Sequence, residues 1–271
     1  MPPDTNIAVN IQNASYSYNK VRALLDVSLQ VAKGERIALL GANGSGKSTL
    51  LRLLAGLVFP EQGRISFFGE PLTADNLQQE EFFYRFRRRV GVVFQNPDAQ
   101  LFNARVYDEV AFGPLQLNWP SDQVRQRVEE VLSTMGISEL RDRAPHRLSG
   151  GEKKRVALAS VLVSQPEVLL LDEPTAALDP GSQSQMIELL SSWRDGSRTV
   201  VTATHDLDAL ETIADRCFVL HNGRVAGEGD PISILHDTRL LEQTGLIRLH
   251  PHRHDGKPGK PHPHLHKNES L

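Results

Sequence analysis

The stretch Gly41-Ala42-Asn43-Gly44-Ser45-Gly46-Lys47-Ser48 decides the fold because of what stands on either side of it. The apolar run from Arg36 to Leu40 before it indicates a buried strand, and leucines at helical spacing follow it. Glycines let such a loop wrap so that successive N–H groups point at a phosphate, with the positive end of the next helix behind them. The pattern predicts a phosphate-binding loop between a strand and a helix.

The residue types of this loop predict individual contacts. The ammonium of Lys47 is expected to meet the β and γ phosphates of a nucleotide, and the hydroxyl of Ser48 is expected to bind magnesium. A glycine-rich turn with an incidental lysine is the alternative, and the flanking strand and helix disfavour it. The expected nucleotide contacts are Gly41, Ala42, Asn43, Gly44, Ser45, Gly46, Lys47, Ser48 and Thr49.

A second apolar run, from Val168 to Leu171, ends in the adjacent carboxylates Asp172 and Glu173. Such a run is typical of a strand that is covered on both faces. Because neighbouring side chains on a strand diverge, Asp172 is expected to face magnesium, and Glu173 to face the attacking water as general base. The alternative is that both are simple helix-capping acids.

The composition is that of an ordinary globular chain of 271 residues, with 39% hydrophobic and 23% charged residues and a net charge of -3. Nucleic acid is not the expected partner, because polyanion binding usually needs a basic excess on one face. We expect no signal peptide and no apolar run of the roughly 18 residues that span a bilayer, so any membrane would be reached through another protein. The single cysteine, Cys217, is expected to be a buried thiol of a cytosolic protein.

Short apolar runs alternate with helical patterns, which predicts an α/β fold with a largely parallel sheet. A helix is expected from Ser121, as N-cap, to Gly136, and Asp206 is expected to cap another helix. The basic run from Tyr84 to Arg89 is interpreted as a solvated face, with contact to a partner or acidic lipid as the alternative. The expected strands are Ile7–Ile11, Val27–Val31, Arg36–Leu40, Val90–Phe94, Val168–Leu171, Thr199–Ala203 and Cys217–Leu220.

The segment Leu148-Ser149-Gly150-Gly151-Glu152 precedes an expected helix from Lys153 to Val163. Small residues before a helix let Ser149 and the N–H of Gly151 approach an anion. With the motifs above and His205, the segment resembles the signature of ABC-type ATPases. The resemblance implies a P-loop NTPase fold that uses ATP and magnesium, with a RecA-like core, an antiparallel β subdomain and a helical signature subdomain.

The resemblance also assigns roles by position. Tyr18 resembles the aromatic residue that stacks on adenine, although Tyr16 competes for that role. Gln95 resembles the loop glutamine that senses magnesium and the transport partner. Ala177-Leu178-Asp179 resembles the D-loop, and His205 resembles the switch histidine that contacts the γ-phosphate.

In this family, the signature of one chain completes the nucleotide site of another, so that two ATP molecules lie between two subunits. Dimerisation is therefore implied by the resemblance, either as a homodimer or as a pair with a second ATPase. Ala42 stands where proline is frequent in the family, and Glu152 where glutamine is frequent. Little effect is expected from either departure.

Two further runs, Phe94 to Phe102 and Val106 to Pro114, are similar to the ATPases of energy-coupling-factor importers. Those importers take up vitamins or transition-metal ions through a membrane scaffold subunit and a separate substrate-capture subunit. The similarity implies a peripheral subunit at the cytoplasmic face of the cell membrane, with these runs at the groove for the coupling helices of the scaffold.

Two rival functions remain. A soluble ABC ATPase for DNA or ribosome work would usually carry a coiled-coil insertion or a second ATPase core, and this sequence has neither. A metal-chaperone GTPase would need an N-K-x-D motif after the phosphate loop. The run Asn19-Lys20-Val21-Arg22 precedes the loop and lacks the aspartate.

From about Leu249 the composition changes to His, Pro, Lys and Gly, which cannot build a core. Neutral imidazole suits nickel and related ions, so the tail predicts import of nickel or cobalt, with a merely solvated tail or a vitamin substrate as alternatives. The expected division is 1–236 for the ATPase domain, 237–248 for a helical extension and 249–271 for a disordered tail. The candidate ligands are His250, His252, His254, His262, His264 and His266.

Overall fold

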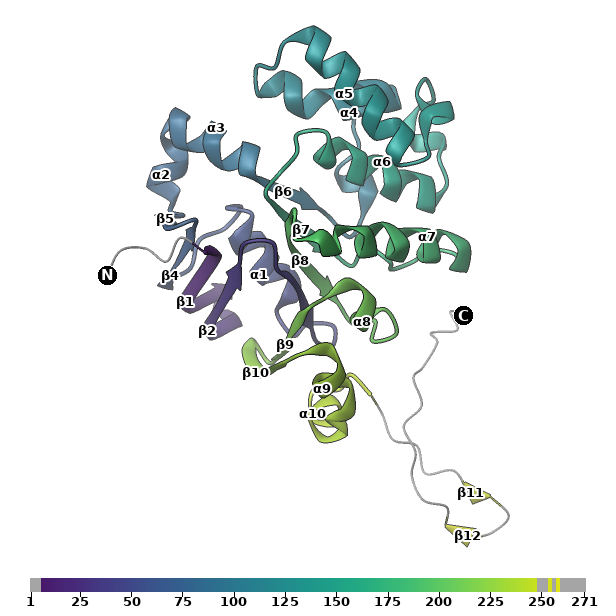
Figure 1. Cartoon of the computed structure of the whole chain (residues 1–271). Coiled ribbons are helices and arrows are strands. Elements are labelled where there is room, and N and C mark those ends of the chain that lie inside the picture. The colour runs from purple at the N-terminus through teal and green to yellow at the C-terminus, as the bar shows by residue number, and fades with distance from the viewer. Residues whose placement is uncertain (1–5, 248–252, 255–256, 259–271) are drawn as a thin grey trace.

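The computed structural model describes residues 6–247, 253–254 and 257–258 and places a six-stranded sheet at the centre of the fold (Figure 1). Its strand order is β10-β9-β3-β8-β7-β6, in which β10 is antiparallel to β9 and all other pairs are parallel. The predicted α/β fold is confirmed. The strands are β3 (Arg36–Leu40), β6 (Val90–Val93), β7 (Val168–Asp172), β8 (Thr199–Thr204), β9 (Arg216–His221) and β10 (Arg224–Gly229).

Successive residues of β3 alternate between the two covered faces of this sheet. Ile37 and Leu39 belong to the hydrophobic cluster that contains the leucines of α1 (Lys47–Leu54). Ala38 and Leu40 belong to the cluster on the other face. All four side chains are fully buried, as expected for a parallel strand with both faces covered. The chain therefore leaves a rigid, buried strand and passes directly into the phosphate loop.

A second sheet, of order β2-β1-β4-β5, forms the predicted antiparallel subdomain beside α1 (Figure 1). Its first two strands extend beyond the predicted apolar runs, because the ladder continues through polar residues with register shifts around Ala14. This extension brings Tyr18 to the end of β1. The strands are β1 (Ile7–Tyr18), β2 (Val21–Ala32), β4 (Gln62–Phe67) and β5 (Glu70–Pro71).

A helical layer, at the top of Figure 1, is inserted in the chain between β6 and β7. The predicted apolar face of its second helix is confirmed, since Val124 and Val128 are buried. The prediction that Ser121 is the N-cap was wrong. Val124 donates its N–H to the carbonyl of Pro120 (3.0 Å), so Pro120 holds that position and Ser121 is already helical. The helices are α4 (Val106–Gln116), α5 (Ser121–Thr134) and α6 (Gly150–Leu162).

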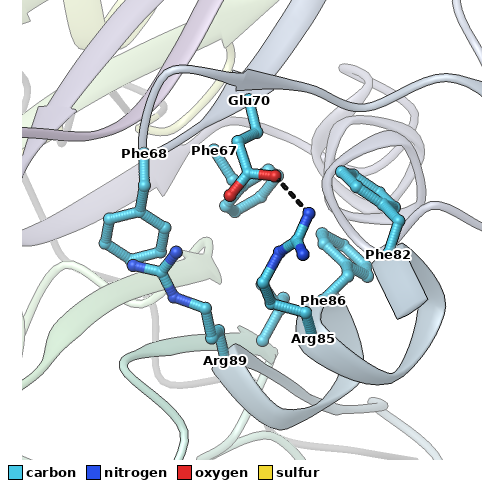
Figure 2. A pocket seen from close by; sticks show the side chains of 8 residues that line it. Phe67, Phe68, Glu70, Phe82, Arg85, Phe86 and Arg89 are labelled. Carbon is cyan, nitrogen blue, oxygen red and sulfur yellow. Dashed lines mark hydrogen bonds and ion pairs between the residues drawn. The ribbon is translucent and has the colours of Figure 1, made fainter. Parts of the chain in front are cut away.

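The basic run lies in α3 (Glu80–Arg89), which lines a small pocket together with β4 and β5 (Figure 2). Arg85 pairs with Glu70 across this pocket at 2.6 Å, between phenylalanine rings. The prediction of a solvated face was wrong for Arg87, which is half-buried and donates to the C-cap carbonyl of α1 (3.2 Å). Arg88 is exposed as predicted, and it also donates to the C-cap carbonyl of α4 (3.0 Å). The run thus fastens α3 to its neighbours.

Two short helices follow β10, and the first of them packs beside β9 and β10 (Figure 1). The second of them falls in the segment 237–248, where a helical extension was expected, and the domain boundaries stay a prediction. The remaining elements are α2 (Ala74–Gln78), α7 (Pro180–Ser191), α8 (Leu210–Ile213), α9 (Pro231–His236), α10 (Thr238–Gln243), β11 (Arg253–His254), β12 (Lys257–Pro258) and the 3-10 helices Pro97–Ala99, Ser138–Leu140, Pro145–Arg147 and Ser192–Asp195.

The candidate tail ligands fall almost entirely beyond the described residues. His254 belongs to β11, whereas His250, His252, His262, His264 and His266 lie outside the described ranges. No helix within those ranges is long and apolar enough to cross a bilayer.

Arg36 offers a test of how the core is held at the start of β3. It is 1% exposed and donates to both carboxylate oxygens of Asp215, at 3.2 and 2.6 Å. Asp215→Asn leaves this buried guanidinium without its counter-charge, so we expect the free energy of unfolding to fall by about 1–3 kcal/mol, measured by urea denaturation. Glu167→Gln, at the exposed partner of Arg89, is the matched control and should cost less than about 1 kcal/mol. Equal losses in the two variants would contradict this account.

Candidate nucleotide-binding site

The phosphate loop lies between the carboxyl end of β3 and the first turn of α1. Gly46 is the N-cap of α1, with φ at 113°. Because glycine has no side chain, the cap does not compete with an anion for the N–H groups of the first turn. A Cβ on Gly41 would lie 2.3 Å from Ser45 Oγ and 2.5 Å from the carbonyl oxygen of Leu220. Only glycine fits at this position, as the sequence pattern requires.

Lys47 directs its ammonium into the loop. The residue is only 5% exposed, and its Nζ donates to the carbonyls of Gly41 (2.6 Å) and Ala42 (3.4 Å). The same Nζ lies 3.6 Å from Oε1 of Glu173. A buried ammonium in this position can form strong charge-assisted hydrogen bonds with a phosphate chain wrapped by the loop.

Ser48 and Asp172 meet across the site. The hydroxyl of Ser48 donates to Oδ1 of Asp172 at 3.2 Å. Burial raises the pKa of Asp172, and the opposing hydrogen bond from Ser48 does not cancel this effect. Hydroxyl and carboxylate oxygens are ligands that magnesium accepts, and a divalent cation would favour the ionised carboxylate. The pair therefore fits magnesium. Gln95, the third predicted magnesium ligand, lines the same hollow as Ser48.

Glu173 follows β7 in a left-handed conformation, with φ at 47°. Its Oε1 lies 2.9 Å from Nδ1 of His205, the residue after β8. Burial raises the pKa of Glu173, but the hydrogen bond and charge of His205, with the charge of Lys47, outweigh it and lower the pKa overall. The same hydrogen bond raises the pKa of His205 against its partial burial. Glu173 is therefore ionised at neutral pH and can accept a proton.

One hollow collects most of the predicted residues. It encloses about 560 Å³, counting space open to solvent. Tyr18 lies in its lining, its hydroxyl oxygen accepts a hydrogen bond from Arg52 (3.2 Å), and its ring meets the ring of Tyr16 edge-on. Tyr16 is not in the lining, which favours Tyr18 as the adenine contact. The lining residues are Tyr18, Ala23, Asn43, Gly44, Gly46, Lys47, Ser48, Thr49, Gln95 and Glu173.

The signature residues Ser149 and Gly151 do not line this hollow. They begin α6, where Ser149 and Glu152 form a capping box: the Ser149 hydroxyl accepts the N–H of Glu152, and the Glu152 carboxylate accepts the N–H of Ser149 at 2.7 Å. Glu152 therefore keeps the helix-start chemistry expected of it. A Cβ on Gly151 would lie 2.5 Å from Ser182 Oγ, so glycine allows α6 to approach α7.

Two side chains near the site escaped the sequence analysis. Arg52 stands one helical turn after Ser48, a spacing that could have identified it. Lys154 is buried in α6 and donates to three carbonyls of the turn that begins at Glu173. Burial lowers the pKa of Lys154 to about 8, against the attraction of the nearby carboxylates. The signal that could have identified Lys154 is a lysine at a core position of the helix that follows the signature.

Asp206 does not cap a helix, and that prediction was wrong. α8 begins only at Leu210, because the carboxylate of Asp206 instead accepts the N–H of Asp208 (3.0 Å) and the side-chain amide of Gln183 (3.0 Å).

The prediction that Cys217 is a buried thiol is confirmed, and burial raises the pKa of this thiol to about 12. Among the described residues, no group of three or more His, Cys, Asp or Glu side chains is placed to hold a metal ion.

A parallel sheet whose strand ends carry a glycine-rich loop, a buried lysine and paired carboxylates defines a P-loop ATPase. The ABC transporter family matches residues 24–176, and the chain belongs to this family. It is an ATP-hydrolysing subunit of the transporter ATP-binding type, for which ATP and magnesium follow from the family.

Two named relatives cover most of the chain. The nickel import ATP-binding protein NikO of Rhodobacter capsulatus is 53% identical, over 89% of this chain and 96% of the relative. The energy-coupling factor transporter ATP-binding protein EcfA of Methanothermobacter thermautotrophicus is 41% identical, over 88% of this chain and 76% of the relative. The similarity to the energy-coupling-factor ATPases is thereby confirmed.

Two solved structures are similar in fold. One is cbiO1 from Clostridium perfringens, part of the ABC transporter complex cbiONQ, with a TM-score of 0.76 and 38% identity over 89% of this chain and 95% of that chain. The other is a dimeric ATP-binding cassette in a post-hydrolysis state bound to ADP and Pi, with a TM-score of 0.74 and 27% identity over 82% of this chain and 98% of that chain.

The contact between Glu173 and His205 predicts a pH dependence. Because Glu173 raises the pKa of His205 and His205 lowers that of Glu173, the pair stabilises the fold fully between the ordinary glutamate pKa of about 4.3 and the ordinary histidine pKa of about 6.5. It loses this contribution as pH rises through the raised His205 value or falls through the lowered Glu173 value. In Glu173→Gln we expect the His205 pKa to fall, as followed by NMR titration of labelled histidine without magnesium. His205→Gln assigns the signal. An unchanged His205 pKa in Glu173→Gln would refute the coupling.

Proposed function

We propose that this chain hydrolyses ATP, as one member of an ATPase pair, to drive an energy-coupling-factor importer of nickel or cobalt at the cytoplasmic face of the cell membrane. The observation that carries the catalytic part is the ionised Glu173 carboxylate, 2.9 Å from His205 and 3.6 Å from the phosphate-loop lysine. The nickel-import relative supports the choice of cargo. The alternatives are a vitamin as cargo, or a soluble ABC ATPase outside transport.

The chemistry follows from where the side chains lie. The loop N–H groups and Lys47 hold the β and γ phosphates, and Tyr18 stacks on the adenine. Glu173 accepts a proton from the attacking water, while His205 orients Glu173 and contacts the γ-phosphate. Magnesium, held by Ser48, Asp172 and Gln95, would neutralise charge on the phosphates. Positioning and charge do most of the work in such a reaction.

The proposed pairing completes the site. Ser149 and Gly151 begin an α-helix away from the hollow of their own chain, so their phosphate contacts would be made with ATP on a second subunit. The similar dimeric cassette supports this arrangement. The second subunit is either another copy of this chain or a different ATPase.

A surface on the helical layer suits the membrane scaffold subunit. Phe102 is 67% exposed and packs edge-on against Phe112, which is also exposed, with exposed Leu115 on the same helix. The buried carboxylate of Glu109 accepts the N–H groups of Phe102 and Asn103, which fixes the loop that presents these rings. We assign this patch to the coupling helices of the scaffold, which in turn holds the substrate-capture subunit. Nucleic acid is not a proposed partner.

Glu173→Gln and Lys47→Ala separate catalysis from binding. A general base contributes about 10²- to 10⁴-fold in rate, so Glu173→Gln should abolish turnover while it retains ATP and traps a closed dimer. Lys47→Ala should instead lose nucleotide binding. Steady-state hydrolysis, ATP binding and size-exclusion chromatography measure these outcomes. Turnover of Glu173→Gln above about a tenth of the wild-type rate would exclude Glu173 as the base.

The His-rich tail is proposed to buffer or sense the imported ion. A chain truncated after Leu249 should lose nickel binding in calorimetry but hydrolyse ATP nearly as the full chain does, because the catalytic residues lie within the described part of the chain. A full-length variant with the six tail histidines changed to Asn is the matched control and should behave like the truncation. Equal nickel affinity in all three proteins would remove the tail from the mechanism.

A further inference from the structure

Lys154 is a buried cation that the mechanism above does not use. It lies in the second turn of α6 and is only 7% exposed. Its Nζ donates to the carbonyl oxygens of Glu173 (2.9 Å), Pro174 (3.2 Å) and Ala176 (2.5 Å). An ammonium has three N–H donors, and here each is matched by a carbonyl. The contact is therefore complete and leaves no donor for solvent.

The turn that accepts these hydrogen bonds has an unusual conformation. Glu173 has φ at 47° and Ala177 has φ at 58°, and both residues carry a Cβ that disfavours this region. The residue before a proline, here Glu173, is also normally held in an extended conformation. Such backbone persists where the surroundings over-determine it. The N–H of Glu173 donates to the carbonyl of Ala203 in β8, and within the turn the N–H of Ala176 donates to the carbonyl of Glu173.

Lys154 attaches this turn to a further element, the helix α6. Its ammonium gathers carbonyls that would otherwise repel one another, and the backbone angle at Glu173 sets the direction of the carboxylate. That carboxylate has to meet His205 within hydrogen-bond distance. Displacement by about 1 Å at a reacting group can cost about 100-fold in rate. Lys154 is thus hydrogen-bonded to the backbone of Glu173, the residue whose carboxylate has to be oriented toward the attacking water.

We propose that Lys154 is a positioning residue: it holds the Glu173 turn so that the carboxylate is aimed at the attacking water, and it ties that turn to the signature helix. Lys154 stands one turn of α6 after Gly151, so the same helix presents the signature at its start and fixes the base of its own chain through Lys154. This inference rests on the proposed role of Glu173 as general base.

The test compares Lys154→Met and Lys154→Gln in the full-length protein with magnesium and ATP. Methionine keeps the length and removes the donors, so we expect kcat to fall by about 10- to 100-fold, with KM for ATP within about 3-fold of wild type. Glutamine restores two donors and should recover most of the loss. Lys153→Met is the matched control: it removes the neighbouring lysine, which pairs with exposed Asp98 at 2.7 Å, and should leave kcat within about 2-fold.

Combining Lys154→Met with Glu173→Gln distinguishes a loss of positioning of the base from a general destabilisation of the fold. In Glu173→Gln the base is gone, so Lys154→Met should lower the residual single-turnover rate no further. A loss of the same factor in both backgrounds, a rise in KM that matches the fall in kcat, or a Lys154→Met rate within about 3-fold of wild type would each overturn the proposal. If Lys154→Met does not fold in thermal melting, Lys154→Leu, which also lacks the donors, is compared in the two backgrounds by the same criteria.

The two proposals fail in different ways. Substantial turnover by Glu173→Gln removes Glu173 as the base and, with it, the reason for the Lys154 contact. An inactive Glu173→Gln beside a fully active Lys154→Met leaves the base in place and rejects only the positioning role.

Discussion

The rest of the site depends on one charge cluster at the carboxyl ends of three adjacent strands. β8 lies between β3 and β7 in the sheet, and the segments that follow them carry Lys47, His205 and Glu173. Because parallel strands end at the same edge, residues separated by more than a hundred positions meet there within 3.6 Å. A different strand order would leave the lysine and the carboxylate apart, whatever the loop sequence.

Charge balance explains why Glu173 tolerates burial beside Lys47. An isolated buried carboxylate would take up a proton, since burial raises its pKa. At Glu173 the positive charges of His205 and Lys47 reverse that effect, whereas at Asp172 burial prevails. The two neighbouring carboxylates therefore differ in protonation tendency because of their partners and not because of their depth. A magnesium ion beside Asp172 would favour the ionised form of that carboxylate.

The sequence predicted the features that are local. The phosphate loop is a contiguous pattern, and the apolar strand before Asp172 is recognisable from its composition. The two capping predictions failed because a helix boundary depends on which carbonyl accepts the first hydrogen bond. At Ser121 that carbonyl is one residue earlier, and at Asp206 the carboxylate turns toward Gln183 instead. These are tertiary outcomes that single residues do not encode.

Contacts made across long separations were beyond the same reasoning. The basic run of α3 was interpreted as solvated because its charges are dense, yet Arg87 is half-buried and donates to a backbone carbonyl at the end of α1. Lys154 meets carbonyls about twenty positions further along the chain. The sequence pattern identifies Ser149 and Gly151, but only the packing shows that they lie away from the nucleotide hollow of their own chain.

The helical layer is attached to the nucleotide hollow at both ends of its insertion. At the entry, Gln100 accepts the N–H of Phe94 (3.2 Å) and donates to the carbonyl of Ala157 in α6 (2.9 Å). At the exit, the ammonium of Lys154 holds the turn after β7. Since α6 makes both contacts, the loop that carries Gln95 and the turn that carries Glu173 are joined through one rigid helix. Packed helices move as units more readily than they bend, so a shift of α6 reaches both sides of the hollow together.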